Sequence, residues 1–257
     1  MLLESILIFF VILLIFVFFY KQSNHDFNIL QVESLSKAIS ILGERSPTVI
    51  YPFDVHIALW TRKDLLKRPS IMEFPLQNTT LDALLHGTPA EEQIILSRTE
   101  AETLADTVGI QLIVQNDIFQ TFRDTFWWSP LLSLRTEALI GAQGLRKTYA
   151  YSTLICPTEG SILVSLLNGA SEQYLPPMWE GKRLKTMTRD QAPHLEKIQY
   201  VDVIVRPGSL LMVPPHWKIC WEAYETPENG LSSLTTFIEI HHPVSRLVER
   251  TNAFHKN

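Results

Sequence analysis

The stretch "VDVIVRPGSLLMVPPHWKICWEAY", residues 201–224, decides the fold that the sequence predicts. Two apolar runs flank a Pro-Gly pair at 207–208, and a Pro-Pro pair at 214–215 separates the second run from a third that carries Trp217. Pro-Gly favours a tight turn, because proline presets φ and glycine accepts a positive φ. The stretch is therefore typical of three short strands joined by tight turns.

Short apolar runs, separated by turn-forming residues, continue through the chain after residue 133. Glycine and proline separate them, as at Gly160, Gly169 and the Pro-Pro pair 176–177. Many short strands with turn signals between them predict an antiparallel sandwich or barrel. The expected strands are 134–141, 147–156, 161–167, 171–176, 199–206, 209–213, 216–224 and 232–241.

The chain before residue 133 favours helices. Helical spacing of apolar residues predicts short helices at 33–42 and 81–87. The strongest helix is expected at 89–108, with proline and glutamates at its start and Gly109 after its end. The stretch "DTFWWSPLL" (124–132) is expected to be an aromatic connector. Helices followed by strands predict an α+β protein that is mostly β in its C-terminal two-thirds.

The first twenty residues predict a single membrane-spanning helix. The run from Ser5 to Tyr20 has no charge, glycine or proline, and Leu2 and Leu3 extend it toward the roughly 20 residues that cross a bilayer. A cleaved signal peptide would have a basic start and a small-residue cleavage site, and neither is present. We therefore expect an uncleaved, single-pass anchor that contacts lipid from Leu2 to Tyr20.

The charges that flank this span favour a cytoplasmic C-terminal domain. Lys21 follows the span and Glu4 precedes it, as the positive-inside rule expects. If the domain were lumenal, Asn78-Thr79-Thr80 would be a glycosylation sequon.

Length and composition suit one sizeable domain with small additions. The chain has 257 residues, of which 46% are hydrophobic and 19% charged. A net charge of −5 argues against a nucleic-acid partner held by phosphate contacts. We expect Cys156 and Cys220 to be free thiols on buried strands.

Three phrases of the strand-rich region resemble the cupin-like JmjC group of 2-oxoglutarate and iron oxygenases. They are "EALIGAQGLRKTYAYSTL" (137–154), "ILVSLLNGASEQYLPP" (162–177) and "VDVIVRPGSLLMVPPHW" (201–217). The resemblance covers residues 137–241 and implies a double-stranded β-helix, also called a cupin or jelly-roll barrel. With the apolar first segment and the polar stretch after it, the predicted organisation is an anchor at 1–20, a linker at 21–28, a helical part packing on the barrel at 29–132, and the barrel at 133–257.

The iron ligands that the resemblance implies are missing from their positions. Iron(II) in this group takes two histidines and one carboxylate, which leaves positions open for oxygen and co-substrate. The first His-x-Asp/Glu motif falls at Ala150-Tyr151-Ser152 or near Cys156-Pro157-Thr158, depending on which glycine turn anchors it. The third ligand would follow the tryptophan, where the chain has Ile219. The lysine that holds 2-oxoglutarate in some members, expected after Gly169, is also missing.

Other histidines offer only weak replacements as metal ligands. His194-Leu195-Glu196 is the one His-x-Asp/Glu sequence of the chain, but it precedes the strand at 199–206 in a polar stretch. His216 would become a ligand only if the register slipped by three residues. The pair His241-His242 is expected at a strand end, where neighbouring side chains face opposite sides. We predict no catalytic residue, metal or cofactor.

The residues expected to face a site are Tyr151, Thr158, His216, Trp217 and Lys147, which we take as candidate ligand-binding residues. The basic stretch "GKRLKTMTR" (181–189) is either a solvated loop or a contact for an anionic partner or lipid head groups.

The preferred interpretation is a membrane-anchored cupin/JmjC-like pseudoenzyme with a binding or structural assembly role and a possible protein partner. One alternative is an active Fe(II)- and 2-oxoglutarate-dependent hydroxylase or demethylase with displaced ligands. The other is a metal-independent ligand-binding cupin, such as a sugar-binding or isomerase relative. A ligand pocket inside the barrel would favour the last, and a filled interior would favour the structural role.

Overall fold

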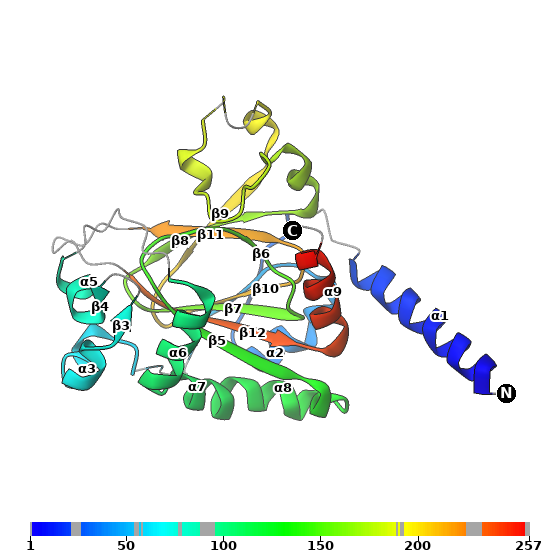
Figure 1. Cartoon of the computed structure of the whole chain (residues 1–257), viewed down its shortest axis with the longest axis horizontal. Coiled ribbons are helices and arrows are strands. Elements are labelled where there is room, and N and C mark those ends of the chain that lie inside the picture. Colours follow the sequence, from blue (N-terminus) through cyan, green and yellow to red (C-terminus); the bar gives the residue numbers. More distant parts are fainter. Residues whose placement is uncertain are drawn as a thin grey trace.

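A computed structural model describes residues 2–21, 27–53, 57, 59–76, 79–87, 96–188, 190, 193–224 and 233–254. Two β-sheets pack face to face, helices cover the outer face of the larger sheet, and helix α1 projects from one side (Figure 1). The linker residues 22–26, the helix start expected at 89–95, Asn78 and Arg189 lie outside the described residues.

The larger sheet has the strand order β1-β2-β10-β7-β12-β5, and the smaller sheet has the order β6-β11-β8-β9. Only β1 and β2 pair in parallel within these two sheets of the described chain. The strands are β1 (Leu30–Val32), β2 (Thr48–Ile50), β5 (Ser133–Ile140), β6 (Gln143–Lys147), β7 (Ser152–Glu159), β8 (Ile162–Leu167), β9 (Tyr200–Val205), β10 (Leu210–Val213), β11 (Lys218–Ala223) and β12 (Leu234–His241). A separate short pair contains β3 (Pro75–Leu76) and β4 (Thr79–Thr80).

An apolar core fills most of the space between the two sheets. Trp221 of β11 stacks on Phe237 of β12, with ring centroids 6.0 Å apart. Trp217 and Ile219 are almost wholly buried in the same cluster. Alternate residues of β11 point the other way, so that Cys220 belongs to a separate cluster on the outer face of the smaller sheet.

Helices pack on the outer face of the larger sheet and form the largest apolar cluster. Helix α6 begins after Ser97, whose side chain and Glu100 form a reciprocal capping box, and it ends at Gly109 with φ +90°. The helices are α2 (Leu35–Ser40), α3 (Arg62–Leu65), α4 (Pro69–Met72), α5 (Leu81–Gly87), α6 (Arg98–Val108), α7 (Ile110–Ile113), the π-helical η2 (Val114–Phe119) and α8 (Gln120–Thr125). The 3₁₀ turns are η1 (Leu42–Glu44), η3 (Ser129–Leu131), η4 (Gly169–Tyr174), η5 (Leu184–Thr186) and η6 (Leu195–Lys197).

Helix α1 (Leu2–Lys21) is the one described helix that is long and apolar enough to cross a membrane. Its mean hydropathy over Glu4–Lys21 is 2.3, and most of its side chains are exposed. Tyr20 at its end is the exception, because only 7% of its surface is accessible. The last helix, α9 (Pro243–Phe254), contacts α1 and lies on the side of the domain from which α1 leaves (Figure 1).

The strand predicted at 171–176 is wrong, since η4 occupies this segment. The Asn168 side chain accepts hydrogen bonds from the backbone N–H and hydroxyl of Ser171, which favours a helical turn over a strand. The strand predicted at 147–156 is interrupted, because β6 ends at Lys147 and β7 begins at Ser152. Between them the backbone of Thr148 pairs with the turn before β11, through the carbonyl of Trp217 and the N–H of His216.

Two helical segments were not predicted. Residues 110–125 continue helically after Gly109, and α9 occupies 243–254 within the predicted barrel range 133–257. The start of α9 is capped by reciprocal hydrogen bonds, from His242 N to Ser245 Oγ (3.0 Å) and from Ser245 N to His242 Nδ1 (2.9 Å). Proline at the first helical position, Pro243, was the available signal.

We predict that Gly144→Ala destabilises the domain. A Cβ at position 144 in β6 would overlap the carbonyl group of Gly181, which is backbone and cannot rotate away. Overpacking of this kind lowers the free energy of unfolding by about 1–3 kcal/mol. Urea unfolding of the full chain in detergent measures it. Gly43→Ala is the control, because no atom lies within 4 Å of that Cβ, and equal stability of the two variants would contradict the prediction.

Candidate functional site

The predicted position of the third metal ligand lies in the interior of the sandwich. Ile219 is the second residue of β11, has no accessible surface and packs in the core between the sheets. Its register partner on β6 is Arg146, so that the two side chains lie on the same face of the smaller sheet. The chemistry available beside Ile219 therefore depends on Arg146.

Arg146 lies at the edge of the interior, with 23% of its side chain exposed, and is held there by an aromatic ring and a carboxylate. Its guanidinium carbon lies 3.9 Å from the centroid of the Phe237 ring. Its two terminal nitrogens donate to the two oxygens of Glu137 at 2.8 and 3.1 Å, and Glu137 is only 2% exposed. This bidentate, charge-assisted geometry is the strongest form of an arginine–carboxylate pair.

Further charged residues extend this pair into what we call the interior ion cluster. Arg98 of α6 reaches Glu137 at 3.2 Å, Glu239 at 3.3 Å and Glu249 at 2.9 Å. Arg135 of β5 reaches Glu239 and Glu249, each at 3.1 Å. The cluster is Arg98, Arg135, Arg146, Glu137, Glu239 and Glu249. It extends to the surface, where the Arg98 side chain is 45% exposed and Arg135 also pairs with Glu102 at 3.2 Å.

Neighbouring donors lower the pKa values of two cluster carboxylates, Glu239 and Glu249. Burial alone would raise the pKa of Glu239, but neighbouring His241, Arg146 and Arg98 hold that pKa well below its usual range. Burial likewise opposes ionisation of Glu249, and Arg135 and Arg98 again lower its pKa. These two carboxylates are paired with arginines. Among the described residues, no three His, Cys, Asp or Glu side chains are grouped to hold a metal ion.

Lys147 lies away from the interior, in a second ionic group. Its ammonium binds both oxygens of Glu172, at 2.7 and 3.0 Å. Glu172 also binds Lys218 at 2.7 Å, and Lys218 has no accessible side-chain surface. Burial lowers the pKa of Lys218 to about 8. We interpret this group as structural, because the ammonium groups of Lys147 and Lys218 both bind the Glu172 carboxylate.

Tyr151 and His216 do come together, around the end of α1. His216 Nε2 lies 2.8 Å from the carbonyl oxygen of Tyr20, and the two rings are 5.4 Å apart. The Tyr20 hydroxyl donates to the carbonyl of Tyr149 at 2.7 Å. The ring of His242 lies 4.9 Å from Tyr20 and 5.1 Å from Tyr151. We call Tyr149, Tyr151, His216 and His242 the Tyr20 socket.

The backbone conformation around His216 orients its side chain toward Tyr20. His216 has φ +71°, a left-handed conformation that is uncommon for a side chain of its size. Its N–H donates to the carbonyl of Thr148 at 2.7 Å, and the Thr148 hydroxyl donates to the carbonyl of Pro214 at 2.8 Å. The Pro-Pro break in the opening stretch therefore turns the chain so that His216 faces Tyr20.

Two other predicted ligand-binding residues, Thr158 and Trp217, lie outside the Tyr20 socket. The Thr158 hydroxyl contacts the carbonyls of Trp60 and Leu234 at the far end of β7. Trp217 lies in the core, with its ring 5.9 Å from that of Phe27.

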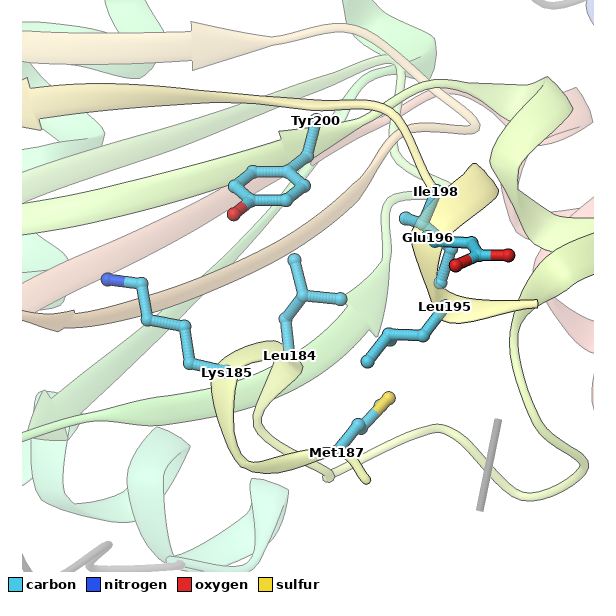
Figure 2. A pocket seen from close by; sticks show the side chains of 7 residues that line it. All are labelled: Leu184, Lys185, Met187, Leu195, Glu196, Ile198 and Tyr200. Carbon is cyan, nitrogen blue, oxygen red and sulfur yellow. The ribbon is translucent and has the colours of Figure 1, made fainter. Parts of the chain in front are cut away.

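Two hollows open on the described surface, away from these residues. One of about 520 Å³ is lined by Leu184, Lys185, Met187, Leu195, Glu196, Ile198 and Tyr200. Figure 2 shows Leu184 and Leu195 reaching toward its middle, while the carboxylate of Glu196 points away. The second, of about 450 Å³, lies beside β1 and the end of β9. Ile219, His216 and Tyr151 line neither hollow.

The weak metal candidates and the cysteines fall elsewhere. His194 is exposed and its ring lies 6.3 Å from that of Tyr174, next to the first hollow. Cys156 and Cys220 are free and buried, and burial raises their pKa values to about 12 and about 11. Of the basic stretch 181–189, Lys185 pairs with Glu222 at 3.2 Å.

The interior ion cluster was missed from the sequence. Its signal is a charge at every second position of an otherwise apolar strand, as in Arg135 and Glu137 of β5 and Glu239 and His241 of β12. In a half-buried strand such positions normally face water, but here both faces of the sheet are covered.

Comparison with known proteins gives no family. No family model and no curated protein matches the chain. Solved structures match weakly, among them hydroquinone 1,2-dioxygenase from Sphingomonas sp. TTNP3, with 15% identity, a TM-score of 0.28 and coverage of 44% of this chain and 61% of that one. Hydroxypropylphosphonic acid epoxidase from S. wedmorenis has 10% identity, a TM-score of 0.26 and coverage of 43% and 44%.

A latex cysteine peptidase from Thevetia peruviana, Peruvianin-I, scores at the same level, with 18% identity, a TM-score of 0.27 and coverage of 44% and 52%. The chain thus spans about half the length of the solved structures that it matches. Likenesses at these TM-scores assign neither a fold family nor an activity.

We predict that Glu137→Gln strongly destabilises the domain. The change leaves Arg146 without a carboxylate partner in the interior and removes one partner of Arg98. Removing one member of a buried ion pair lowers the free energy of unfolding by about 3–5 kcal/mol. Chemical unfolding checks this, with Glu33→Gln as control. Glu33 pairs with Lys37 on the surface, and such a pair contributes at most about 1 kcal/mol. Equal effects of the two changes would show that the interior pair is not required.

Stability is also expected to fall between pH 6.5 and pH 4. Burial lowers the pKa of His216 and of His242 to about 4 from an ordinary value of 6.5. In this window the unfolded chain binds protons that the folded chain does not, so stability is complete above pH 6.5 and decreases as the pH falls. The loss per histidine is on the order of 1–3 kcal/mol.

Unfolding of the full chain at several pH values measures this slope. His216→Asn with His242→Gln flattens it, and asparagine tolerates the left-handed backbone at position 216. His194→Gln, at an exposed position, is the control. A slope that persists in the double variant would assign the pH dependence to other groups.

Proposed function

We propose that this chain is a membrane-anchored protein whose jelly-roll domain, of the cupin/JmjC-like kind, is not catalytic and serves binding or assembly at the membrane surface. Eight consecutive strands support the jelly-roll assignment. Strands β5, β7, β10 and β12 lie in one sheet, and β6, β8, β9 and β11 lie in the other. The chain passes from one sheet to the other at each step except from β8 to β9, which pair within the smaller sheet, and this distribution over two antiparallel sheets supports a jelly roll.

The residues that fill the interior are the observation that supports a non-catalytic domain. Ile219 stands where the third iron ligand would lie, and its register partner Arg146 is paired with Glu137. An iron oxygenase needs neutral imidazole and free carboxylate donors with open positions between them. This end of the interior instead presents an aliphatic side chain, an aromatic ring and carboxylates already bound to arginine. Function is argued from the site rather than the fold, and this site supports a structural interior.

The contacts of Tyr20 support an uncleaved anchor. Removal of the first helix as a signal peptide would empty the Tyr20 socket. It would also leave His216 Nε2 and the carbonyl of Tyr149 without their present partners. Buried polar groups without partners are costly, so the folded domain favours a chain that retains α1.

Lys21 directly after the span supports the orientation that places the domain in the cytoplasm. Glycosylation of Asn78 in cells would contradict it.

The non-catalytic proposal predicts no 2-oxoglutarate turnover. The full chain, purified in detergent without oxygen and supplied with iron(II), is expected to bind no stoichiometric iron. When oxygen and 2-oxoglutarate are then added, it is expected to release no succinate. Metal analysis and succinate detection measure the two quantities. An active oxygenase with a displaced ligand would bind iron and lose it in His216→Asn, and that pair of results would overturn the proposal.

A further inference from the structure

The domain is fixed to the end of α1 at more than one point. Tyr20 makes the two hydrogen bonds of the socket, and Arg45 Nη2 donates to the carbonyl of Phe19 at 3.0 Å. Helix α9 contacts α1 as well. Because these contacts come from separate elements, the domain keeps one orientation relative to the helix, and one of its sides faces the membrane that α1 would enter.

A turn with exposed apolar residues packs against the Tyr20 socket. Trp128 lies 6.1 Å from His242 and 5.4 Å from Tyr151, both members of the socket. Its neighbour Trp127 points outward and is 93% exposed. Leu131, at the end of the same turn 126–131, is 61% exposed. Two large, exposed apolar side chains, Trp127 and Leu131, therefore lie near the end of α1.

The outer face of α9 adds positive charge at the same place. Ser245 and Val248 face the domain and are buried, whereas Arg246, Leu247 and Arg250 are exposed. Figure 1 shows α9 between the sheets and α1, so that its outer face looks toward the side from which α1 leaves. His242 joins the two surfaces, because it caps α9 and also packs against Trp128.

We propose that the turn 126–131 and the outer face of α9 form a second contact with the bilayer, at the level of the lipid head groups. This inference rests on the proposed anchor. Tyr20 marks the end of the apolar run, and tyrosine and tryptophan concentrate at this interface. Trp127 and Leu131 enter the boundary between head groups and acyl chains, and Arg246 and Arg250 bind anionic head groups.

Quenching of tryptophan fluorescence by brominated lipid tests this directly. The full chain is reconstituted into vesicles of phosphatidylcholine and phosphatidylserine that contain phosphatidylcholine brominated near the head-group end of its acyl chains. Among the six tryptophans only Trp127 is fully exposed, since Trp60, Trp217 and Trp221 are buried and Trp128 and Trp179 are partly covered. We expect the wild-type chain to be quenched and Trp127→Phe to lose most of that quenching.

Trp60→Phe is the matched control. Trp60 is fully buried near α3, on the opposite side of the domain from α1, and its Nε1 has no hydrogen-bond partner to lose (Figure 1). This variant should retain the wild-type quenching. The double variant Arg246→Gln with Arg250→Gln should reduce quenching in vesicles with phosphatidylserine and leave it unchanged in vesicles of phosphatidylcholine alone.

Flotation of the same vesicles separates the two proposals. If the chain floats with the vesicles but Trp127→Phe is quenched as strongly as the wild type, the second contact is overturned and the anchor stands. If the chain does not float, the anchor fails and this inference fails with it. Absence of quenching in every vesicle composition, with flotation intact, would likewise overturn the second contact.

Discussion

The ion pair between Arg146 and Glu137 is the interaction on which the character of this domain depends. Transfer of two charges from water into a protein interior costs free energy, and their attraction offsets that cost only while both partners are present. Arg146 shares its register with Ile219 and lies over Phe237, so that the pair fills the end of the interior beside the predicted ligand position. This arrangement is the observation on which the proposal of a non-catalytic domain rests.

The same charges connect the interior to the side of the domain from which α1 leaves. Arg98 brings α6 to the cluster, and Glu249 brings α9 to it. Strand β12 passes from Glu239 through His241 to His242, which caps α9 and packs against Tyr20. The interior ion cluster, α9 and α1 are therefore linked by direct contacts. A change in the cluster is expected to affect the contact with α1.

The sequence predicted the strands best where turn chemistry is strong. The Pro-Gly and Pro-Pro pairs separated β9, β10 and β11 correctly, because these residues restrict the backbone whatever surrounds them. The segment 171–176 was misread, since capping by Asn168 outweighs strand propensity there. Helix α9 was missed because the resemblance extended the barrel to the end of the chain.

The site was less predictable, because its contacts join distant parts of the chain. Tyr151 and His216 were predicted to bind a ligand, and that stays a prediction; in the structure both lie around Tyr20, which is 196 residues before His216. Strand periodicity gives the face on which Arg146 lies, but not the carboxylate that it meets there. Pairing of buried charges depends on the sheet register, which single-sequence patterns do not specify.

The central claim, that the interior is filled rather than catalytic, is tested most directly by titrating the full chain with manganese(II) in the presence of 2-oxoglutarate and following the metal by electron paramagnetic resonance. Manganese(II) occupies oxygen- and nitrogen-rich sites of the kind that iron(II) uses in such oxygenases. The account predicts that the signal of free aqueous manganese keeps its full intensity at an equimolar amount of protein. Loss of that signal at an equimolar amount of protein would show that the folded chain holds a metal site and would contradict the account.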